Sequence, residues 1–132
     1  MASHSYTDAR TTKTTDSNNL SQRIAVVPYN LASAFGTYDI GTFSIPGLRL
    51  GRGVRYVGSA NIPGSAFDTK EATLFDLVAS YDFGVADRTL AGWRAQLNNR
   101  NVTDKIYVGC AAATQCRYYP PRNVFGTIAY RW

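Results

Sequence analysis

The sequence predicts an all-β protein, an antiparallel meander of about six strands from the wall of a transmembrane β-barrel. Apolar and polar residues alternate with period two in segments of about ten residues, which is the pattern of half-exposed strands. The connections between these segments are alternately long and short. The 132-residue chain is also rich in aromatic residues (13%) and poor in charged ones (17%), a composition that favours sheets over helices.

The strands are expected over residues 2–9 and 29–40, in segments that start at Leu48, Ala72 and Trp93, and over residues 124–132. The last segment alternates most clearly and residues 29–40 least. Side chains two residues apart share a face of a strand, so four segments each have an apolar face. These faces are Leu48, Leu50, Val54 and Tyr56; Phe75, Leu77, Ala79, Tyr81 and Phe83; Trp93, Ala95 and Leu97; and Val124, Gly126, Ile128, Tyr130 and Trp132.

The connections indicate which kind of sheet this is. Long ones are expected near residues 11–28, 59–71 and 104–121, and short ones near 41–46 and 84–91. Long loops at one end and short turns at the other are typical of outer-membrane barrels. A soluble sandwich also alternates, but here aromatic residues gather at the segment ends, as in the girdles of a lipid-facing wall. They are Tyr38, Tyr81, Phe83, Trp93, Tyr130 and Trp132 toward the short turns, and Tyr56 and Phe75 toward the long loops.

Several other classes find little support. The net charge of +5 comes from cations scattered singly between Arg10 and Arg131, not from the clustered stripe of a nucleic-acid-binding protein. The one histidine, His4, has no catalytic or metal-binding pattern around it, so we expect no enzyme, no metal and no cofactor. No apolar run is long enough for a transmembrane helix, and the polar start does not resemble a signal peptide. Cys110 and Cys116 fit either a small disulfide-closed loop or two unrelated thiols.

Strings along nearly the whole chain, in order, resemble the last strands of TonB-dependent siderophore receptors, most closely the ferrichrome and ferrioxamine type. Each string is weakly specific, but the ordered series is strong. They are Ser5-Tyr-Thr-Asp-Ala-Arg10, Val27-Pro28, Ala32-Ser33, Gly47-Leu-Arg-Leu-Gly-Arg-Gly-Val-Arg-Tyr-Val-Gly58, Thr73-Leu-Phe-Asp76, Ser80-Tyr-Asp-Phe83, Leu97-Asn-Asn-Arg-Asn-Val-Thr-Asp-Lys105-Ile-Tyr107, Cys110 with Cys116, and Ala129-Tyr-Arg-Trp132.

This resemblance implies a location and partners. Such receptors are barrels of about 22 strands with a plug domain in the lumen. They lie in the outer membrane of Gram-negative bacteria and take up ferric siderophores with energy passed on by TonB. Residues 1–132 would be the C-terminal part of the barrel, with the long loops extracellular and the plug domain and N-terminal strands absent. The chain would then contact outer-membrane lipid and the barrel-assembly machinery, and would not transport alone.

The resemblance also assigns residues. It implies a Cys110–Cys116 disulfide in the last extracellular loop, with Tyr107, Tyr118 and Tyr119 around it as possible siderophore contacts, the alternative being packing between loops. Tyr130 and Trp132 match the C-terminal aromatic assembly signal. The lumen-facing arginines could pair with plug carboxylates or simply with Asp39, Asp76 and Asp82 across strands. These arginines are Arg49, Arg55, Arg94, Arg100 and Arg131.

Three residues depart from the family pattern. Arg52 and Asn99 fall on the apolar face where small or aliphatic residues are usual, and Tyr119 stands where glycine is frequent. A lipid-facing arginine at mid-strand costs about 2–4 kcal/mol. Two rival hypotheses remain: a soluble or periplasmic β-rich binding module, and an inert product of a truncated gene or of a start codon assigned too late.

Overall fold

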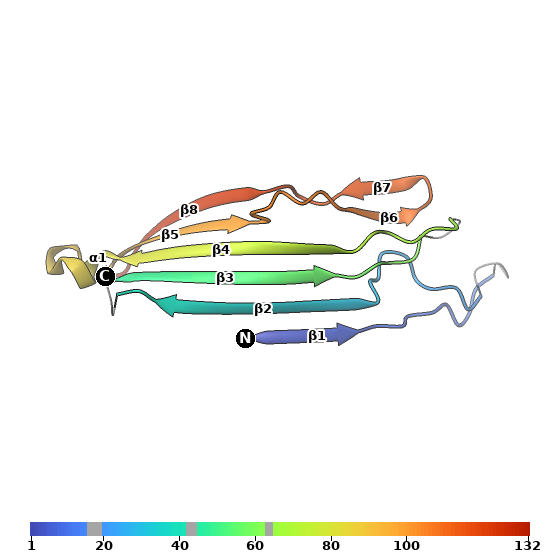
Figure 1. Ribbon diagram of the computed structural model, residues 1–132, viewed down its shortest axis with the longest axis horizontal. Helices are drawn as coiled ribbons and strands as arrows, with labels where there is room; N and C mark the ends of the chain where they lie inside the picture. The colour runs from blue at the N-terminus through green and yellow to red at the C-terminus, as the bar shows by residue number, and fades with distance from the viewer. Residues whose placement is uncertain (16–19, 42–44, 63–64) are drawn as a thin grey trace.

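The computed structural model describes residues 1–132 except 16–19, 42–44 and 63–64. Figure 1 shows one layer of strands, with the long connections at one end and the short turns at the other. The strands of this antiparallel sheet follow chain order: β1 (Ala2–Tyr6), β2 (Asn30–Asp39), β3 (Leu48–Val57), β4 (Ala72–Asp82), β5 (Trp93–Arg100) and β8 (Asn123–Tyr130). The predicted six-stranded meander is therefore confirmed. A separate hairpin, β6 (Val108–Ala112) with β7 (Gln115–Tyr118), lies within the expected last loop.

The strand ends differ from the prediction in places. β1 stops at Tyr6, and β8 stops at Tyr130, so Trp132 lies beyond the sheet. The expected short connection after β4 holds a one-turn helix α1 (Phe83–Ala86) and a 3₁₀ turn η2 (Arg88–Leu90). Each is started by an aspartate cap, since Asp82 accepts the Gly84 N–H (3.2 Å) and Asp87 the Thr89 N–H (2.8 Å).

The turn between η2 and β5 depends on Gly92. This residue has φ +89°, a left-handed conformation that favours glycine, and its carbonyl accepts the Arg131 N–H at 2.9 Å. A side chain at this position would collide with the Arg131 carbonyl. The close approach of the turn to the end of β8 keeps the Trp93 and Tyr130 rings together, with centroids 5.0 Å apart.

The strand register divides the residues into two faces. Leu50 pairs with Ala79, Ala79 with Leu97, and Leu97 with Gly126, so the predicted apolar residues of neighbouring strands lie side by side. We call this the apolar face, and the intervening residues form the polar face. The apolar face holds Ala32, Ala34, Gly36, Tyr38, Leu48, Leu50, Arg52, Val54, Tyr56, Thr73, Phe75, Leu77, Ala79, Tyr81, Trp93, Ala95, Leu97, Asn99, Val124, Gly126, Ile128 and Tyr130.

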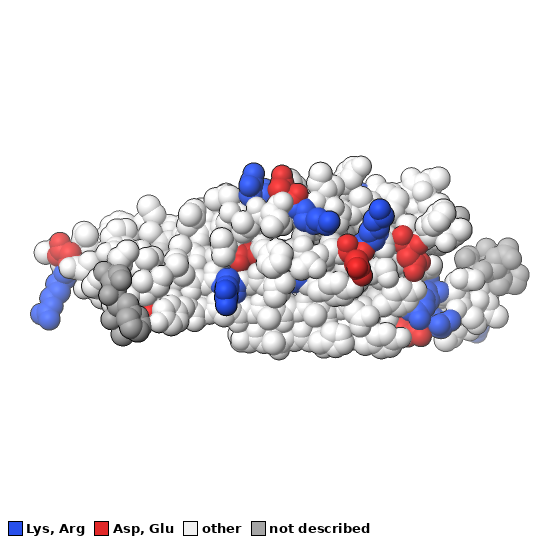
Figure 2. All heavy atoms as spheres, viewed as in Figure 1, with Lys and Arg blue, Asp and Glu red and all other residues white. Residues whose placement is uncertain are grey.

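Nothing in the described part of the chain covers the apolar face. The buried apolar residues among those described are Ala60, Ala72, Leu74 and Cys110, whereas Leu97 and Ile128 are 52% and 72% exposed. Figure 2 shows one face of the molecule, on which uncharged residues cover much of the surface and charged side chains lie mostly over the middle and toward the loop end. No helix in the described residues is both long and apolar enough to cross a bilayer. So large an apolar surface calls for a partner other than water.

Candidate functional site

Ion pairs cross the polar face from strand to strand. The five arginines predicted to face the lumen all lie on this face or at its end, and three of them pair with the aspartates named from the sequence. Among the described residues, Arg100 and Arg131 make no ion pair. The pairs are Arg49–Asp39 at 3.4 Å, Arg55–Asp76 at 2.6 Å and Arg94–Asp82 at 3.2 Å. For these three arginines, neighbouring strands already supply a carboxylate.

Asp76 is the least exposed of these aspartates, and it binds a backbone N–H as well as its arginine. It accepts hydrogen bonds from Arg55 Nε (2.6 Å) and Nη2 (3.0 Å), and a third from the Asn101 backbone N–H (2.9 Å). Asn101 is 3% exposed, and its side chain donates to the Lys105 carbonyl and accepts the Lys105 N–H. The connection after β5 is thereby fastened to the middle of the sheet.

The hairpin above this connection is closed in two ways. Cys110 and Cys116 form a disulfide, as the resemblance implied. The rings of Tyr107 and Tyr119 stack at 4.4 Å with an interplanar angle of 2°, and the Tyr119 N–H donates to the Tyr107 carbonyl (3.0 Å). Gly109 makes the stack possible, because a Cβ there would lie 2.7 Å from the Tyr119 ring.

Two of the three predicted contact tyrosines therefore lie together, and the third does not join them. Tyr118 is 76% exposed and lies outside the stack that Tyr107 and Tyr119 form. Burial raises the pKa of the Tyr107 phenol, against an opposing effect of the nearby Arg55 charge. Tyr107 therefore remains a neutral phenol across the physiological pH range.

A cavity of about 390 Å³ lies on the polar face at the loop end of the sheet, beside the segments that lead into and out of this hairpin. We call it the loop-end pocket. It combines two arginines with two aromatic rings and the buried Asn101. Its lining residues are Arg55, Leu74, Arg100, Asn101, Tyr107, Pro120, Pro121, Asn123 and Phe125. Its size is that of a small-molecule site, and its lining offers both cations and ring surfaces.

Sequence reasoning missed part of this pocket. Asn101 was not identified as a site residue, although an asparagine just after a strand is a signal for a turn with positive φ, and its φ is +53°. Phe125 lies on the polar face of β8, and nothing in the local sequence pattern indicates that the Arg100 guanidinium carbon lies 5.8 Å from its ring centroid. The two prolines belong to the loop and carry no periodic signal.

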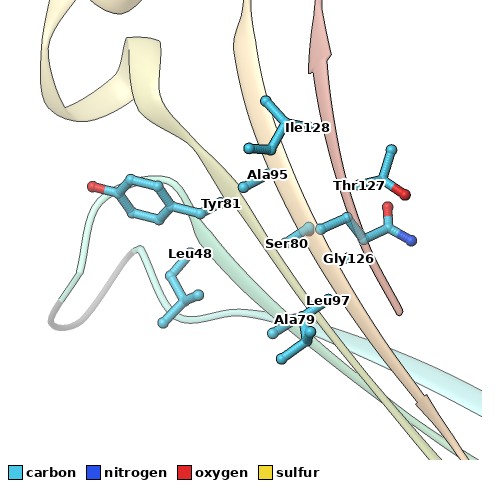
Figure 3. Close-up of a pocket in the computed structure, with 10 residues that line it drawn as sticks. Leu48, Ala79, Ser80, Tyr81, Ala95, Leu97, Gly126, Thr127 and Ile128 are labelled. Atoms are coloured by element: carbon cyan, nitrogen blue, oxygen red, sulfur yellow. The ribbon is translucent and has the colours of Figure 1, made fainter. Parts of the chain in front are cut away.

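A second concavity lies on the opposite face, near the short turns. Its volume is about 520 Å³, no charged residue lines it, and Figure 3 shows Leu48, Tyr81, Leu97 and Ile128 around small residues such as Ala95. The small side chains create the hollow on an otherwise continuous apolar surface. It offers no charged group to orient a ligand and most of its lining is apolar, so we treat it as part of the wall surface.

Residues 1–102 match the family described as TonB dependent receptor-like, β-barrel. The chain belongs to this family. Over 132 residues it is 34% identical to the ferrioxamine B receptor of Salmonella typhimurium, covering 98% of this chain and 18% of that protein. It is 33% identical to the ferrichrome outer membrane transporter and phage receptor of Escherichia coli, covering 100% of this chain and 17% of that protein. The TonB-dependent receptor chain thus spans about a fifth of these relatives' length.

Solved structures of the same fold agree. The crystal structure of BauA, the ferric preacinetobactin receptor of Acinetobacter baumannii, superposes with a TM-score of 0.74 at 23% identity, covering 96% of this chain and 18% of BauA. The pyoverdine outer membrane receptor FpvA of Pseudomonas aeruginosa gives a TM-score of 0.63 at 24% identity, covering 81% and 16%. The predicted barrel-wall fold and the outer-membrane location are confirmed by the family match and these relatives.

Proposed function

We propose that the chain forms the C-terminal part of the barrel of a ferric-siderophore receptor, with residues 1–132 supplying wall strands and the last extracellular loop. The observation that carries this is the uncovered apolar face, backed by a polar face on which three arginines are paired across strands. Relatives named for ferrioxamine and ferrichrome support the cargo. Transport would need the plug and the TonB system of a complete receptor, so we expect none from these residues alone.

Each group of residues has a role in this proposal. The polar face lines the lumen, and the long connections face outward. Tyr107 and Tyr119 form a rigid aromatic surface at the mouth for contact with the cargo, and the more exposed Tyr118 is a further candidate contact. Tyr130 and Trp132 are the signal read by the barrel-assembly machinery. The function is binding and passage, with no catalytic step and no resident cofactor.

Expression of the chain followed by partition between buffer and detergent tests the wall assignment. We expect it to be insoluble in plain buffer and to show the circular dichroism of β-structure in micelles, because the apolar face needs a hydrocarbon environment. A soluble, cooperatively folding monomer in buffer would favour the alternative, a soluble or periplasmic β-rich binding module whose apolar face is a covered core.

A further inference from the structure

We propose that the loop-end pocket selects an anionic ferric complex and that Arg100 recognises its negative charge. This deepens the proposed function and rests on it, because the ferric cargo is assigned there. The pocket encloses about 390 Å³, and strand residues of the polar face line it together with Tyr107, Pro120 and Pro121 from either side of the disulfide-closed hairpin. The proposal adds the sign of the charge on the ferric complex that the pocket binds.

The charges around the pocket do not balance. Arg55 and Arg100 both line it, and no carboxylate does. Asp76, whose side chain is 18% exposed, binds Arg55 through two hydrogen bonds and so neutralises it. Asp76 also acts electrostatically on Arg100, but Arg100 makes no ion pair in the described part of the chain. One positive charge therefore remains for a ligand.

The geometry of Arg100 suits an anionic oxygen ligand. Its guanidinium carbon lies 5.8 Å from the centroid of the Phe125 ring, a contact that steadies the side chain while the N–H groups stay available. A guanidinium presents a planar fork of donors that matches paired anionic oxygens better than an ammonium does. The residual charge and the fork together favour a cargo with negatively charged oxygens.

The aromatic lining favours a small complex over the carboxylate of a protein segment. Tyr107 and Phe125 give the pocket two ring surfaces, and the stack with Tyr119 holds Tyr107 in position. Rigid rings supply contact area at a small entropic cost. A lone carboxylate is too small to use that area. Asn101 is hydrogen-bonded to Asp76 and to Lys105, so this part of the pocket lining is held in place without a ligand.

Equilibrium dialysis of the micelle-folded chain against radiolabelled iron complexes tests the proposal. The probes are a ferric tris-catecholate, which is anionic, and a ferric trihydroxamate of similar size, in which ligand charges balance the ferric ion. We expect tighter binding of the tris-catecholate, and a loss of about tenfold to a hundredfold in Arg100→Gln. Arg100→Lys should recover part of the affinity. Arg94→Gln is the matched control, since Arg94 lies on the same strand and face but pairs with Asp82.

Each other outcome would overturn the proposal. Equal affinity for the two probes, or tris-catecholate binding that Arg100→Gln leaves unchanged, contradicts charge selection by Arg100. Binding of a synthetic acidic peptide at Arg100, with neither ferric probe bound, would identify the site as a contact for a lumen segment. In all these cases the wall assignment stands or falls separately, on detergent partition and circular dichroism.

Discussion

Arg52 and Asn99 interrupt the apolar face at one level of the sheet. Arg52 pairs in register with Gly36 and Leu77, and Leu77 pairs with Asn99, so both polar residues lie in a single cross-strand row. Arg52 makes no ion pair among the described residues, and Asn99 Oδ1 is buried without a hydrogen-bond partner. The two residues that depart from the family pattern thus lie on the apolar face, as predicted.

We expect Arg52→Leu to stabilise the chain in lipid vesicles by about 2–4 kcal/mol, because it removes a charge from the middle of the lipid-facing wall. Denaturant unfolding monitored by tryptophan fluorescence measures this free energy of unfolding. Arg49→Leu is the control, since Arg49 belongs to the polar face and pairs with Asp39, and it should not stabilise. Equal or lower stability in Arg52→Leu would mean that Arg52 has a partner or reaches the headgroup region.

At the scale of elements, Asp76 connects the sheet to the hairpin. Strand β4 carries the carboxylate, β3 supplies Arg55, and the connection after β5 supplies the Asn101 N–H. Asn101 then holds Lys105, two residues before the Tyr107–Tyr119 stack. The hairpin β6–β7 does not pair with the main sheet, so these contacts are important for its position.

We expect Asp76→Asn to speed hydrogen exchange at the backbone amides of Asn101 and Lys105 by about tenfold or more, because charge-assisted hydrogen bonds are lost. Exchange measured by mass spectrometry on the micelle-folded chain gives the rates. Asp82→Asn is the matched control, because Asp82 also lies on β4 and pairs with an arginine but does not contact this connection. Unchanged exchange in Asp76→Asn would show that the hairpin is held by other contacts.

At the scale of the whole molecule, the sheet has two outer strands. β1 and β8 each pair on one side only, and their other sides present backbone donors and acceptors. Within a bilayer, unpaired backbone groups are especially costly, which is why membrane sheets close into barrels. The chain as described therefore has strong reason to pair with further strands.

The isolated chain should associate through these edges. We expect chemical crosslinking in micelles to give dimers and larger species whose fraction rises with the ratio of protein to detergent, because edge pairing satisfies the exposed backbone groups. Light scattering coupled to gel filtration provides a second measurement. A monodisperse monomer at every ratio would contradict this and would require the two edges to be closed within one chain.

The alternation of side chains determined the strands, their faces and the odd positions of Arg52 and Asn99, because period two is a local property that each segment carries by itself. The tertiary structure decided which residues meet. Asp76 reaches Arg55 and Asn101, which are 21 and 25 residues away, only through strand register and the path of a loop. The cap-driven turn after β4 and the hairpin β6–β7 also lack a periodic signal. The wall was therefore predictable from the sequence, while the loop-end pocket depends on contacts between distant segments.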